Sequence, residues 1–350
     1  MSNPIKIGVT GIHGYGKTYF STLANSSDAK ITAICDINTG LAESTAKEFG
    51  IDRVYSDFNE LLANGDVDAV FIATPHYLHH NMTMAALEAG KHVLCEKPLA
   101  ITAKDAYEMA DTAKKKGLLL GCHYNRRQSA HVKLLKVLLE KGVLGDVYAM
   151  NLKWMARYTG FMFSPESGWR VKKDKAGGGI MIGRGSHMLD AALYLLNYPE
   201  IAAVNANVNS KLSGFEVDDY AFVTVRLNNG ALITVECSYV ANIPHYSEKI
   251  EYEVFGTKAG AYCLQQDKDF KFYLGHGEAP NDGWVDLAGN YNPKDYEKAY
   301  PVSIVEDFVQ AIKEKREPLV TGMQAAVITD ILETAYRSSA EQQELRLSKT

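Results

Sequence analysis

Long hydrophobic runs are missing from this sequence of 350 residues, and no apolar stretch reaches the length of about 20 residues that a helix needs to cross a bilayer. The N-terminal segment lacks the apolar core of a secretory signal, because strand-like residues 5–9 follow almost at once. Cysteine is also scarce: the five cysteines form no CxxC pair and no zinc-ligand spacing. A scattered, odd set is typical of reduced thiols, so we expect a cytoplasmic protein.

Positive charge is not in excess either. The formal net charge is −5, and the longest basic run, Lys114 to Lys116, stands before Gly117 as at a helix end. Nucleic acids and membrane surfaces select for basic patches, so neither is an expected partner. With 46% hydrophobic and 23% charged residues, the composition is that of a globular chain. Low-complexity segments, internal repeats and flexible linkers are absent from the sequence, and its length suits two domains.

The first 122 residues alternate between short β-branched runs and longer amphipathic stretches. The pattern predicts strands at residues 5–9, 31–35, 69–73, 92–95 and 118–122, and helices at residues 15–25, 40–49, 78–89 and 102–116. Thr102 is the expected N-cap of the last of these helices. Strands that alternate with helices in this way predict an α/β domain with a doubly wound parallel sheet.

From residue 123 the pattern changes to long alternating runs. Strands are expected at residues 147–155, 202–209, 221–227, 231–240 and 249–255, and helices at residues 130–141, 179–197, 302–315 and 324–338. Asn228, Asn229 and Gly230 have the composition of a hairpin turn. We therefore expect residues 123–350 to form an α+β domain with a broad, mostly antiparallel sheet, across which the last two helices pack.

The segment GIHGYGKT, residues 11–18, follows the first strand and opens the first helix. Such a loop lets backbone N–H groups approach a phosphate at a helix N-terminus. As written it matches the P-loop pattern, and it also resembles a dinucleotide loop whose second glycine is displaced by one position. In the dinucleotide interpretation the cofactor lies against five residues of the loop: Gly11, His13, Gly14, Tyr15 and Gly16.

Asp36 favours the dinucleotide interpretation. It ends the second strand, where a carboxylate accepts hydrogen bonds from the 2′-hydroxyl of an adenosine ribose. A P-loop enzyme needs instead an acidic residue for magnesium, but the apolar strand 69–73 ends in Thr74 and Pro75. A P-loop and a turn without ligand remain the alternatives. The carboxylate repels a 2′-phosphate, and the next two residues supply no arginine, so NAD is expected rather than NADP.

Four motifs occur in the order Thr74-Pro75-His76-Tyr77-Leu78-His79, Glu96-Lys97-Pro98, Tyr124-Asn125-Arg126-Arg127, and the glycine-rich stretch from Gly177 to His187-Met188-Leu189-Asp190. Together they resemble the family of glucose–fructose oxidoreductase, inositol dehydrogenase and MocA. The resemblance runs from about residue 5 to about residue 338. It implies a Rossmann domain for NAD over residues 1–122, and a substrate-binding domain over residues 123–350 whose open sheet faces a partner subunit in a homodimer or homotetramer.

The resemblance also implies the site residues. Thr74, Pro75, His79, Glu96 and Lys97 belong to the cofactor site, and Lys97 and His187 line the reaction site, with a cis bond between Lys97 and Pro98. Oxidation of a secondary alcohol requires a base for the hydroxyl proton while hydride leaves. A neutral imidazole suits that role near neutral pH, and an ammonium stabilises the developing alkoxide. We expect His187 to be the base and Lys97 the stabiliser, with a sugar or polyol as substrate.

One position departs from the family pattern. Many members carry Asp four residues before the histidine, where this chain has Gly183. Arg184 beside it suits a more oxidised or acidic substrate, or it is a surface arginine. Tyr124, Arg126, Trp169 and Arg170 are further candidates for substrate contacts, with ordinary packing as the alternative. Tyr158 and Phe161 to Phe163 are expected in the core, with a pocket wall as the alternative. The pair His79-His80 has no third ligand at usable spacing, so no metal is expected.

Three functions are compatible with these residues. The leading hypothesis is an NAD-dependent dehydrogenase of a sugar, cyclitol or sugar derivative. The family also includes NAD-dependent glycoside hydrolases, which recycle the cofactor within each turnover. The third is a non-catalytic protein that senses NAD, an alternative which Gly183 keeps open and the intact Lys97 and His187 oppose.

Overall fold

The computed structural model describes residues 3–157, 165–211, 213–243, 248–266, 269–276, 285–286 and 303–348. Their contacts divide the chain into two compact units. Unit 1 comprises Met1–Tyr124 and Pro301–Thr329, and unit 2 comprises Asn125–Tyr300 and Asp330–Thr350. The sequence pattern assigns residues 301–329 to the second domain, whereas the contacts place them in unit 1. Each unit is therefore built from two separate segments of the chain.

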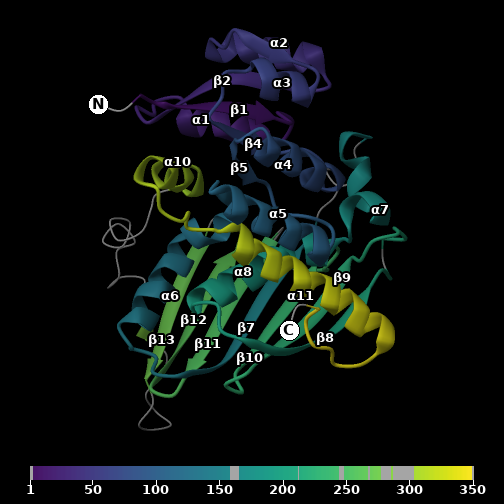
Figure 1. The fold of residues 1–350 in the computed structure, drawn as a ribbon. Helices are drawn as coiled ribbons and strands as arrows, with labels where there is room; N and C mark the ends of the chain where they lie inside the picture. Colours follow the sequence, from purple (N-terminus) through teal and green to yellow (C-terminus); the bar gives the residue numbers. More distant parts are fainter. Residues whose placement is uncertain are drawn as a thin grey trace. The chain divides into compact units, whose positions relative to one another are not determined.

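Unit 1 contains a six-stranded sheet in the order β3-β2-β1-β4-β5-β6, with every neighbouring pair parallel (Figure 1). Its strands are β1 (Ile5–Thr10), β2 (Ala29–Cys35), β3 (Arg53–Tyr55), β4 (Ala69–Ile72), β5 (His92–Cys95) and β6 (Leu120–Cys122). Every residue of β4 is buried, as in a parallel sheet that is covered on both faces. The predicted doubly wound parallel sheet is confirmed.

The helices of unit 1 follow the predicted alternation. They are α1 (Gly16–Leu23), α2 (Thr39–Phe49), α3 (Phe58–Asn64), α4 (His79–Glu88), α5 (Ala103–Lys116) and α10 (Ile304–Glu314). Thr102 is confirmed as the N-cap of α5, since its side chain accepts a hydrogen bond from the N–H of Asp105 over 3.1 Å. Strand β3 and helix α3 were not predicted. The three residues of β3 are too few for a visible alternation of apolar and polar side chains.

Helix α10 belongs to unit 1, so the expectation that it packs across the second sheet is wrong. Phe308 is fully buried and its ring lies 6.0 Å from that of Phe71 on β4. Lys313 and Gln310 of the same helix both bond to Asp28, at the start of β2. An amphipathic pattern predicts that a helix has a buried face but does not identify the surface that covers it.

Unit 2 contains an eight-stranded sheet in the order β14-β13-β12-β11-β7-β10-β9-β8. The strands are β7 (Val147–Ala156), β8 (Ile201–Asn209), β9 (Tyr220–Leu227), β10 (Leu232–Ser238), β11 (Glu248–Gly256), β12 (Ala259–Gln266), β13 (Asp269–His276) and β14 (Val285–Asp286). Among the described strands of this sheet only the pair β7 and β10 is parallel, which confirms a large, mostly antiparallel sheet. The turn through Asn229 joins β9 to β10 as predicted. The three strands after β11 were not predicted.

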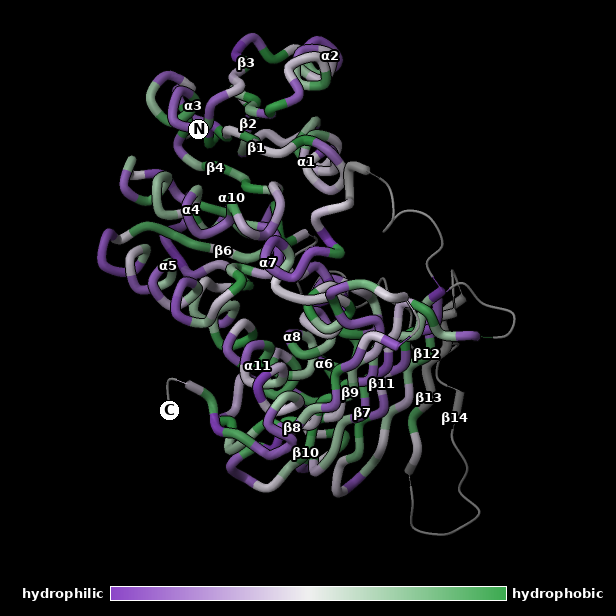
Figure 2. The backbone as a smooth tube through the Cα atoms, turned by 90° about the vertical axis from the view of Figure 1, so that its right-hand side faces the viewer, coloured by the Kyte–Doolittle hydropathy of each residue, from purple (hydrophilic) through white to green (hydrophobic). Residues whose placement is uncertain are grey.

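Helices cover one face of this sheet. Unit 2 contains α6 (Ala130–Glu140), α7 (Lys173–Ala176), α8 (Ser186–Leu195) and the second half of α11 (Gly322–Glu341), and in Figures 1 and 2 α6 and α8 lie along the same face. Alternate residues of β7, including Leu152 and Trp154, are buried, while those between them are partly exposed. No described helix of unit 2 lies on the opposite face (Figure 2), so the sheet is open as expected.

Across the described ranges, no helix has the length and apolarity to cross a membrane.

Candidate active site

The glycine loop lies at the carboxyl end of β1, where the strand order of unit 1 reverses. A Cβ atom on Gly16 would lie 1.9 Å from the carbonyl oxygen of Gly11, and one on Gly11 would lie 2.7 Å from the carbonyl of Ala73. Gly11 also has a φ of +76°. The loop can therefore fold tightly against the end of β4 only with glycine at both positions. His13, Gly14 and Tyr15 are exposed on this loop. Such switch points are where doubly wound sheets bind their ligands.

Asp36 is fixed beside this loop. One carboxylate oxygen accepts the N–H of Ile12 over 2.9 Å, and the other accepts the N–H of Asn38 over 2.9 Å. Each carboxylate oxygen has a second lone pair, so both can still accept a hydrogen bond from a ligand hydroxyl. The following side chain, Ile37, is 93% exposed and brings no positive charge to the carboxylate. The geometry suits a ribose with free hydroxyls.

His79 links the loops that follow β4 and β5. Its imidazole is fully buried, with Nδ1 2.8 Å from the carbonyl oxygen of Pro98 and Nε2 2.9 Å from that of Thr74. Burial lowers the pKa of His79, and the two carbonyl groups only partly oppose that shift. A neutral ring donates to one carbonyl at a time. His79 therefore joins the loop of Thr74 to the loop in which Pro98 follows Lys97.

Glu96 and Lys97 lie on the loop after β5. The buried Glu96 carboxylate accepts the hydroxyl of Tyr19 over 2.8 Å and lies 2.7 Å from Nδ1 of His123. Burial would raise the pKa of Glu96, but the interactions with His123, Tyr19 and Lys97 outweigh it and lower that pKa. Lys97 is half-buried, and the predicted cis bond to Pro98 is confirmed. No spacing in the sequence indicates that Tyr19 and His123 meet Glu96.

His187 lies in the first turn of α8 in unit 2. A π-helical turn, Met181–Gly185, leads directly into that helix. The imidazole is 4% exposed, and its ring lies 6.0 Å from the ring of Trp154 on β7. The helix thus begins with an irregular turn and presents its histidine against an aromatic side chain of the sheet.

Asp218 caps the turn that leads to His187. Its buried carboxylate accepts the N–H of Gly179 over 2.6 Å and the N–H of Met181 over 2.8 Å. The hydroxyl of Tyr336 donates to the same carboxylate over 2.7 Å. Burial raises the pKa of Asp218, while these hydrogen bonds oppose that rise. A carboxylate at a helix N-terminus satisfies N–H groups that have no partner within the helix. Sequence reasoning missed Asp218, because it stands far along the chain from the turn.

Two of the candidate arginines of unit 2 stack on Trp154. The guanidinium carbon of Arg126 lies 4.1 Å from the centre of the indole, and that of Arg184 lies 4.5 Å from it. The indole N–H donates to Glu248 over 2.6 Å. Arg126, Arg184 and His187 therefore share one aromatic neighbour, which the sequence did not single out.

Arg170 and Trp169 form a second stacked pair. The guanidinium carbon of Arg170 lies 4.4 Å from the centre of the indole of Trp169. Burial lowers the pKa of Arg170, Tyr239 opposes that shift, and the positive charge of Arg184 adds to it. Arg170 and Arg184 are thus close enough to interact.

Tyr124 is fully buried in unit 1. Tyr158 and Phe161 to Phe163 lie outside the described residues.

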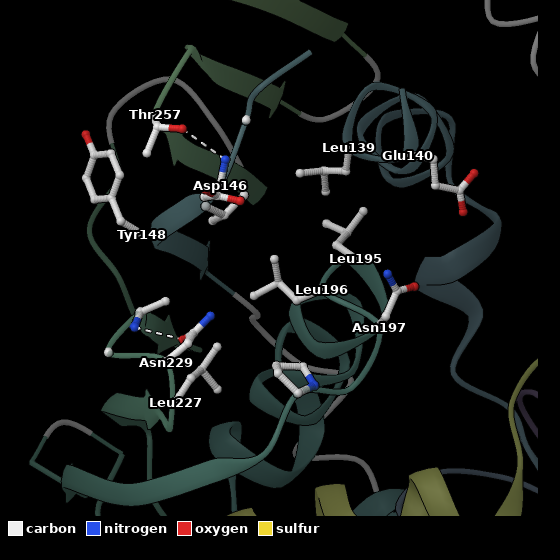
Figure 3. A pocket seen from close by; sticks show the side chains of 15 residues that line it. Leu139, Glu140, Asp146, Tyr148, Leu195, Leu196, Asn197, Leu227, Asn229 and Thr257 are labelled. Carbon is white, nitrogen blue, oxygen red and sulfur yellow. Dashed lines mark hydrogen bonds between the residues drawn. The ribbon is translucent and has the colours of Figure 1, made fainter. Parts of the chain in front are cut away.

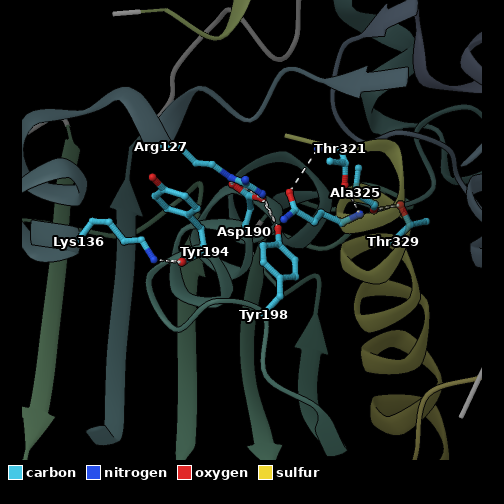
Figure 4. A network of polar contacts seen from close by, with 9 residues as sticks. Arg127, Lys136, Asp190, Tyr194, Tyr198, Thr321, Ala325 and Thr329 are labelled. Atoms are coloured by element: carbon cyan, nitrogen blue, oxygen red, sulfur yellow. Dashed lines mark hydrogen bonds and ion pairs between the residues drawn. The ribbon is translucent and has the colours of Figure 1, made fainter. Parts of the chain in front are cut away.

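The last residue of the H-x-x-D motif, Asp190, holds α8 to the segment before α6. Its carboxylate accepts hydrogen bonds from Nε of Arg127 over 2.9 Å and from Nη2 over 2.6 Å (Figure 4). Both side chains are completely buried. The hydroxyl of Tyr198 bonds to both partners. Burial opposes the charge on Arg127, but Asp190 more than compensates and raises its pKa. This pair fixes the helix one turn beyond His187.

A pocket of about 780 Å³ in unit 2 contains none of the predicted site residues. Tyr148 and Leu195 line it, together with Leu196 (Figure 3). Tyr148 stands near the start of β7 and Leu195 at the end of α8, whereas Trp154 and His187 stand near the opposite ends of these elements. The pocket is therefore separate from the His187 site.

His80 has acidic neighbours that the sequence spacing does not reveal. Asp105 and Glu108 of α5 place carboxylate oxygens so that these and a ring nitrogen of His80 all lie within 4.8 Å of one another. Nε2 of His80 is 3.2 Å from the carboxylate of Glu108, as in a simple ion pair on a partly exposed surface. The group is compatible with that ion pair alone, and we assign it no metal.

Comparison with known proteins agrees with this arrangement over both units. The family model described as "Oxidoreductase family, NAD-binding Rossmann fold" matches residues 5–124, and the GFO/IDH/MocA C-terminal domain matches residues 132–262. D-glucoside 3-dehydrogenase of Escherichia coli K12 is 32% identical over 277 residues, covering 74% of this chain and 77% of that protein. Levoglucosan dehydrogenase of Pseudarthrobacter phenanthrenivorans is 29% identical over 347 residues, covering 87% of each.

Solved structures give the same result. A levoglucosan dehydrogenase in complex with NADH superposes with a TM-score of 0.86 at 25% identity, and 99% of each chain is covered. Two family models in the expected order, a relative above 30% identity and a matching fold over the full chain all agree. The chain belongs to the GFO/IDH/MocA family of oxidoreductases, with an NAD-binding Rossmann fold in its N-terminal region.

Proposed function

We propose that this protein is an NAD-dependent dehydrogenase that transfers hydride between the nicotinamide and a hydroxyl-bearing carbon of a sugar, cyclitol or sugar derivative. The observation that carries the cofactor half of the proposal is Asp36, held by two backbone N–H groups beside the glycine loop. The names of the relatives, which include dehydrogenases of a glucoside and of levoglucosan, support the substrate class. In this proposal unit 1 binds the cofactor and unit 2 supplies the substrate pocket.

The residues of unit 1 fit NAD. At the tight turn through Gly11 and Gly16 the N-terminus of α1 would hold the pyrophosphate, and Asp36 would accept hydrogen bonds from the ribose hydroxyls. When bound, NAD supplies the acceptor for the hydride. The carboxylate of Asp36 would repel a 2′-phosphate, so NAD is preferred to NADP. His79 keeps the loops after β4 and β5 in place around this site.

Two side chains act on the reacting hydroxyl group in this proposal. The imidazole of His187 takes the hydroxyl proton of the substrate as hydride leaves the same carbon. The ammonium of Lys97 stabilises the negative charge that develops on the oxygen. The negative charge of Glu96 attracts that ammonium, and the same attraction contributes to the lowered pKa of Glu96. The sugar ring then receives hydrogen-bond donors and flat faces from Arg126, Trp169, Arg170 and Arg184. Tyr124, the last residue of the first segment of unit 1, is a further candidate for substrate contact.

A nucleotide titration tests the cofactor assignment first. NADH fluorescence is followed with NADPH and with ATP plus magnesium as competitors. Tight NADH binding that ignores ATP supports the proposal, and binding of ATP alone would mean that residues 11–18 form a P-loop. Reduction of NAD⁺ is then measured with methyl β-D-glucopyranoside, levoglucosan, myo-inositol and D-glucuronate as substrates.

Lys97→Ala tests the catalytic assignment. We expect turnover to be abolished while the NADH dissociation constant changes less than about 3-fold, since Lys97 acts on the reacting oxygen. Lys104→Ala, at an exposed position on α5, is the matched control and should retain full activity. Full activity of Lys97→Ala would remove Lys97 from the mechanism. Bond cleavage without net NADH would point instead to a glycoside hydrolase, and NADH binding without any turnover to an NAD sensor.

We also propose that the open face of the sheet in unit 2 meets a second copy of the chain in a homodimer or homotetramer. The exposed Phe222 on β9, 39% accessible, is an apolar side chain of the kind that such contacts cover. Sedimentation equilibrium measures the mass directly, and a monomer at micromolar concentration would contradict the proposal. The five free, buried cysteines support a cytoplasmic location.

A further inference from the structure

Gly183 faces the hydroxyl of Tyr239. A Cβ atom on Gly183 would lie 1.9 Å from the phenolic oxygen and 3.1 Å from the ring carbon that carries it. The hydroxyl therefore occupies the space in which any side chain at position 183 would begin. Gly183 is part of the π-helical turn before α8, one turn ahead of His187. Both residues belong to unit 2, and Tyr239 directly follows β10.

The phenol and the helix turn are held by the same short segment. The N–H of Tyr239 donates to the carbonyl oxygen of Asp219 over 3.0 Å, and the hydroxyl of Ser238 donates to that oxygen over 3.2 Å. The preceding residue, Asp218, caps the turn through the N–H groups of Gly179 and Met181. The backbone of Tyr239 and the turn that carries Gly183 are thus both tied to the same pair of residues, Asp218 and Asp219.

The surroundings of the phenol are cationic. Tyr239 interacts electrostatically with Arg170, which in turn interacts with Arg184. Arg184 stacks on Trp154, and Trp154 packs against His187. Tyr239 is therefore linked to His187 through Arg170, Arg184 and Trp154. Guanidinium groups carry donors and no acceptors, so this corner favours a ligand oxygen that accepts hydrogen bonds.

We propose that Tyr239 is a specificity-determining residue, whose hydroxyl donates a hydrogen bond to a carboxylate oxygen of a sugar acid beside Gly183 on the helix turn. The proposal rests on the proposed function. An ionised carboxylate can only accept hydrogen bonds, whereas a phenol can also donate one. A carboxylate at position 183 would repel an acidic substrate, and Tyr239 beside Arg170 and Arg184 attracts it.

The test compares D-glucuronate with methyl β-D-glucopyranoside in steady-state reduction of NAD⁺. Wild type should prefer D-glucuronate. Tyr239→Phe removes only the hydroxyl and should lower kcat/KM for D-glucuronate by about 10- to 100-fold, mainly through KM, the range expected for one hydrogen bond to a charged group. The value for the glucoside should change less than about 2-fold. Tyr220→Phe is the matched control, since that hydroxyl bonds to Glu236 on the same sheet.

A double replacement tests the shared space. Gly183→Asp alone should lose activity on both sugars, because the new side chain overlaps Tyr239. Gly183→Asp with Tyr239→Ala removes the overlap and should restore activity on the neutral glucoside but not on D-glucuronate. NADH binding, measured by fluorescence, should be the same in all variants, which excludes a general loss of folding.

Three results would overturn the assignment of Tyr239. They are a wild type that turns over only neutral sugars, Tyr239→Phe with unchanged kcat/KM for D-glucuronate, and an equal loss on both sugars. A wild type that binds NADH but oxidises none of the four sugars and cyclitols named above contradicts the proposed function itself. The two failures are therefore distinguishable.

Discussion

Asp190→Asn removes one charge from a buried ion pair and nearly preserves its shape. Asp190 and Arg127 are completely shielded from solvent, and the carboxylate receives two guanidinium nitrogens over 2.9 and 2.6 Å. Two charges about 4 Å apart attract each other by about 4 kcal/mol at the effective dielectric constant of a protein. Loss of one partner also leaves the other buried without compensation, which typically costs about 3–5 kcal/mol. We expect the free energy of unfolding to fall by that amount.

Replacement of both charges should recover most of the loss. Arg127→Met with Asp190→Leu leaves no isolated charge in the interior, so the double variant should be more stable than Asp190→Asn. The matched control is Arg226→Ala on the exposed pair of Arg226 and Glu344, where solvent screens the interaction and a much smaller effect is expected.

Urea unfolding followed by circular dichroism measures these differences, with m-values checked for equality. The activity provides a second readout. Because Asp190 stands one turn beyond His187 on α8, Asp190→Asn should lower kcat while leaving the dissociation constant of NADH unchanged. A loss of stability below about 1 kcal/mol, the value of a surface pair, would show that the buried pair does not hold α8.

Three further predictions concern the nucleotide site and the pH dependence. Asp36→Ala should weaken NADH binding more than NADPH binding in fluorescence titrations, and an equal loss would show that Asp36 does not hold the ribose. Gly16→Ala should abolish NADH binding, because the new methyl would overlap the carbonyl oxygen of Gly11. Gly40→Ala should bind normally, because its methyl would meet only Oδ1 of Asn38 at 3.7 Å, an ordinary van der Waals distance. Burial and the charge of Arg126 lower the pKa of His131 to about 3. In the unfolded chain the pKa of His131 is about 6.5. Below that pH the unfolded chain binds a proton that the folded protein does not, so the free energy of unfolding falls by about 1.4 kcal/mol per pH unit between pH 6.5 and 3, and above pH 6.5 His131 causes no loss. His131→Phe should reduce that slope in urea titrations between pH 5 and 7, and an unchanged slope would contradict the prediction.

The periodicity of the chain predicted most of the architecture. Residues 69–72 form a fully buried parallel strand because the run Ala-Val-Phe-Ile has no polar member. Helix α10 was assigned to the wrong sheet, since its apolar face carries no information about its partner. Strand β3 was missed because a segment of three residues is defined by its neighbour β2 rather than by its own pattern.

The candidate site was predicted only as far as local motifs extend. The triplet Glu96-Lys97-Pro98 and the motif at His187 each lie within a few residues, so the sequence displays them. Asp218, His123 and Tyr239 act through contacts with residues far along the chain, and no spacing rule links those partners. Gly183 was noticed as a missing side chain, but the phenol that fills its space follows from the fold alone.

Neither unit is continuous in the sequence, and this has a consequence for the order of folding. Phe308 on α10 completes the core of unit 1 against Phe71, after the strands of unit 2 have been synthesised. Tyr336 on α11 completes the cap of the turn before His187 through Asp218. Domains generally fold as units while the chain emerges from the ribosome. Here the Rossmann core and the histidine helix both wait until α10 and α11 have been synthesised, so the two units complete their folding together.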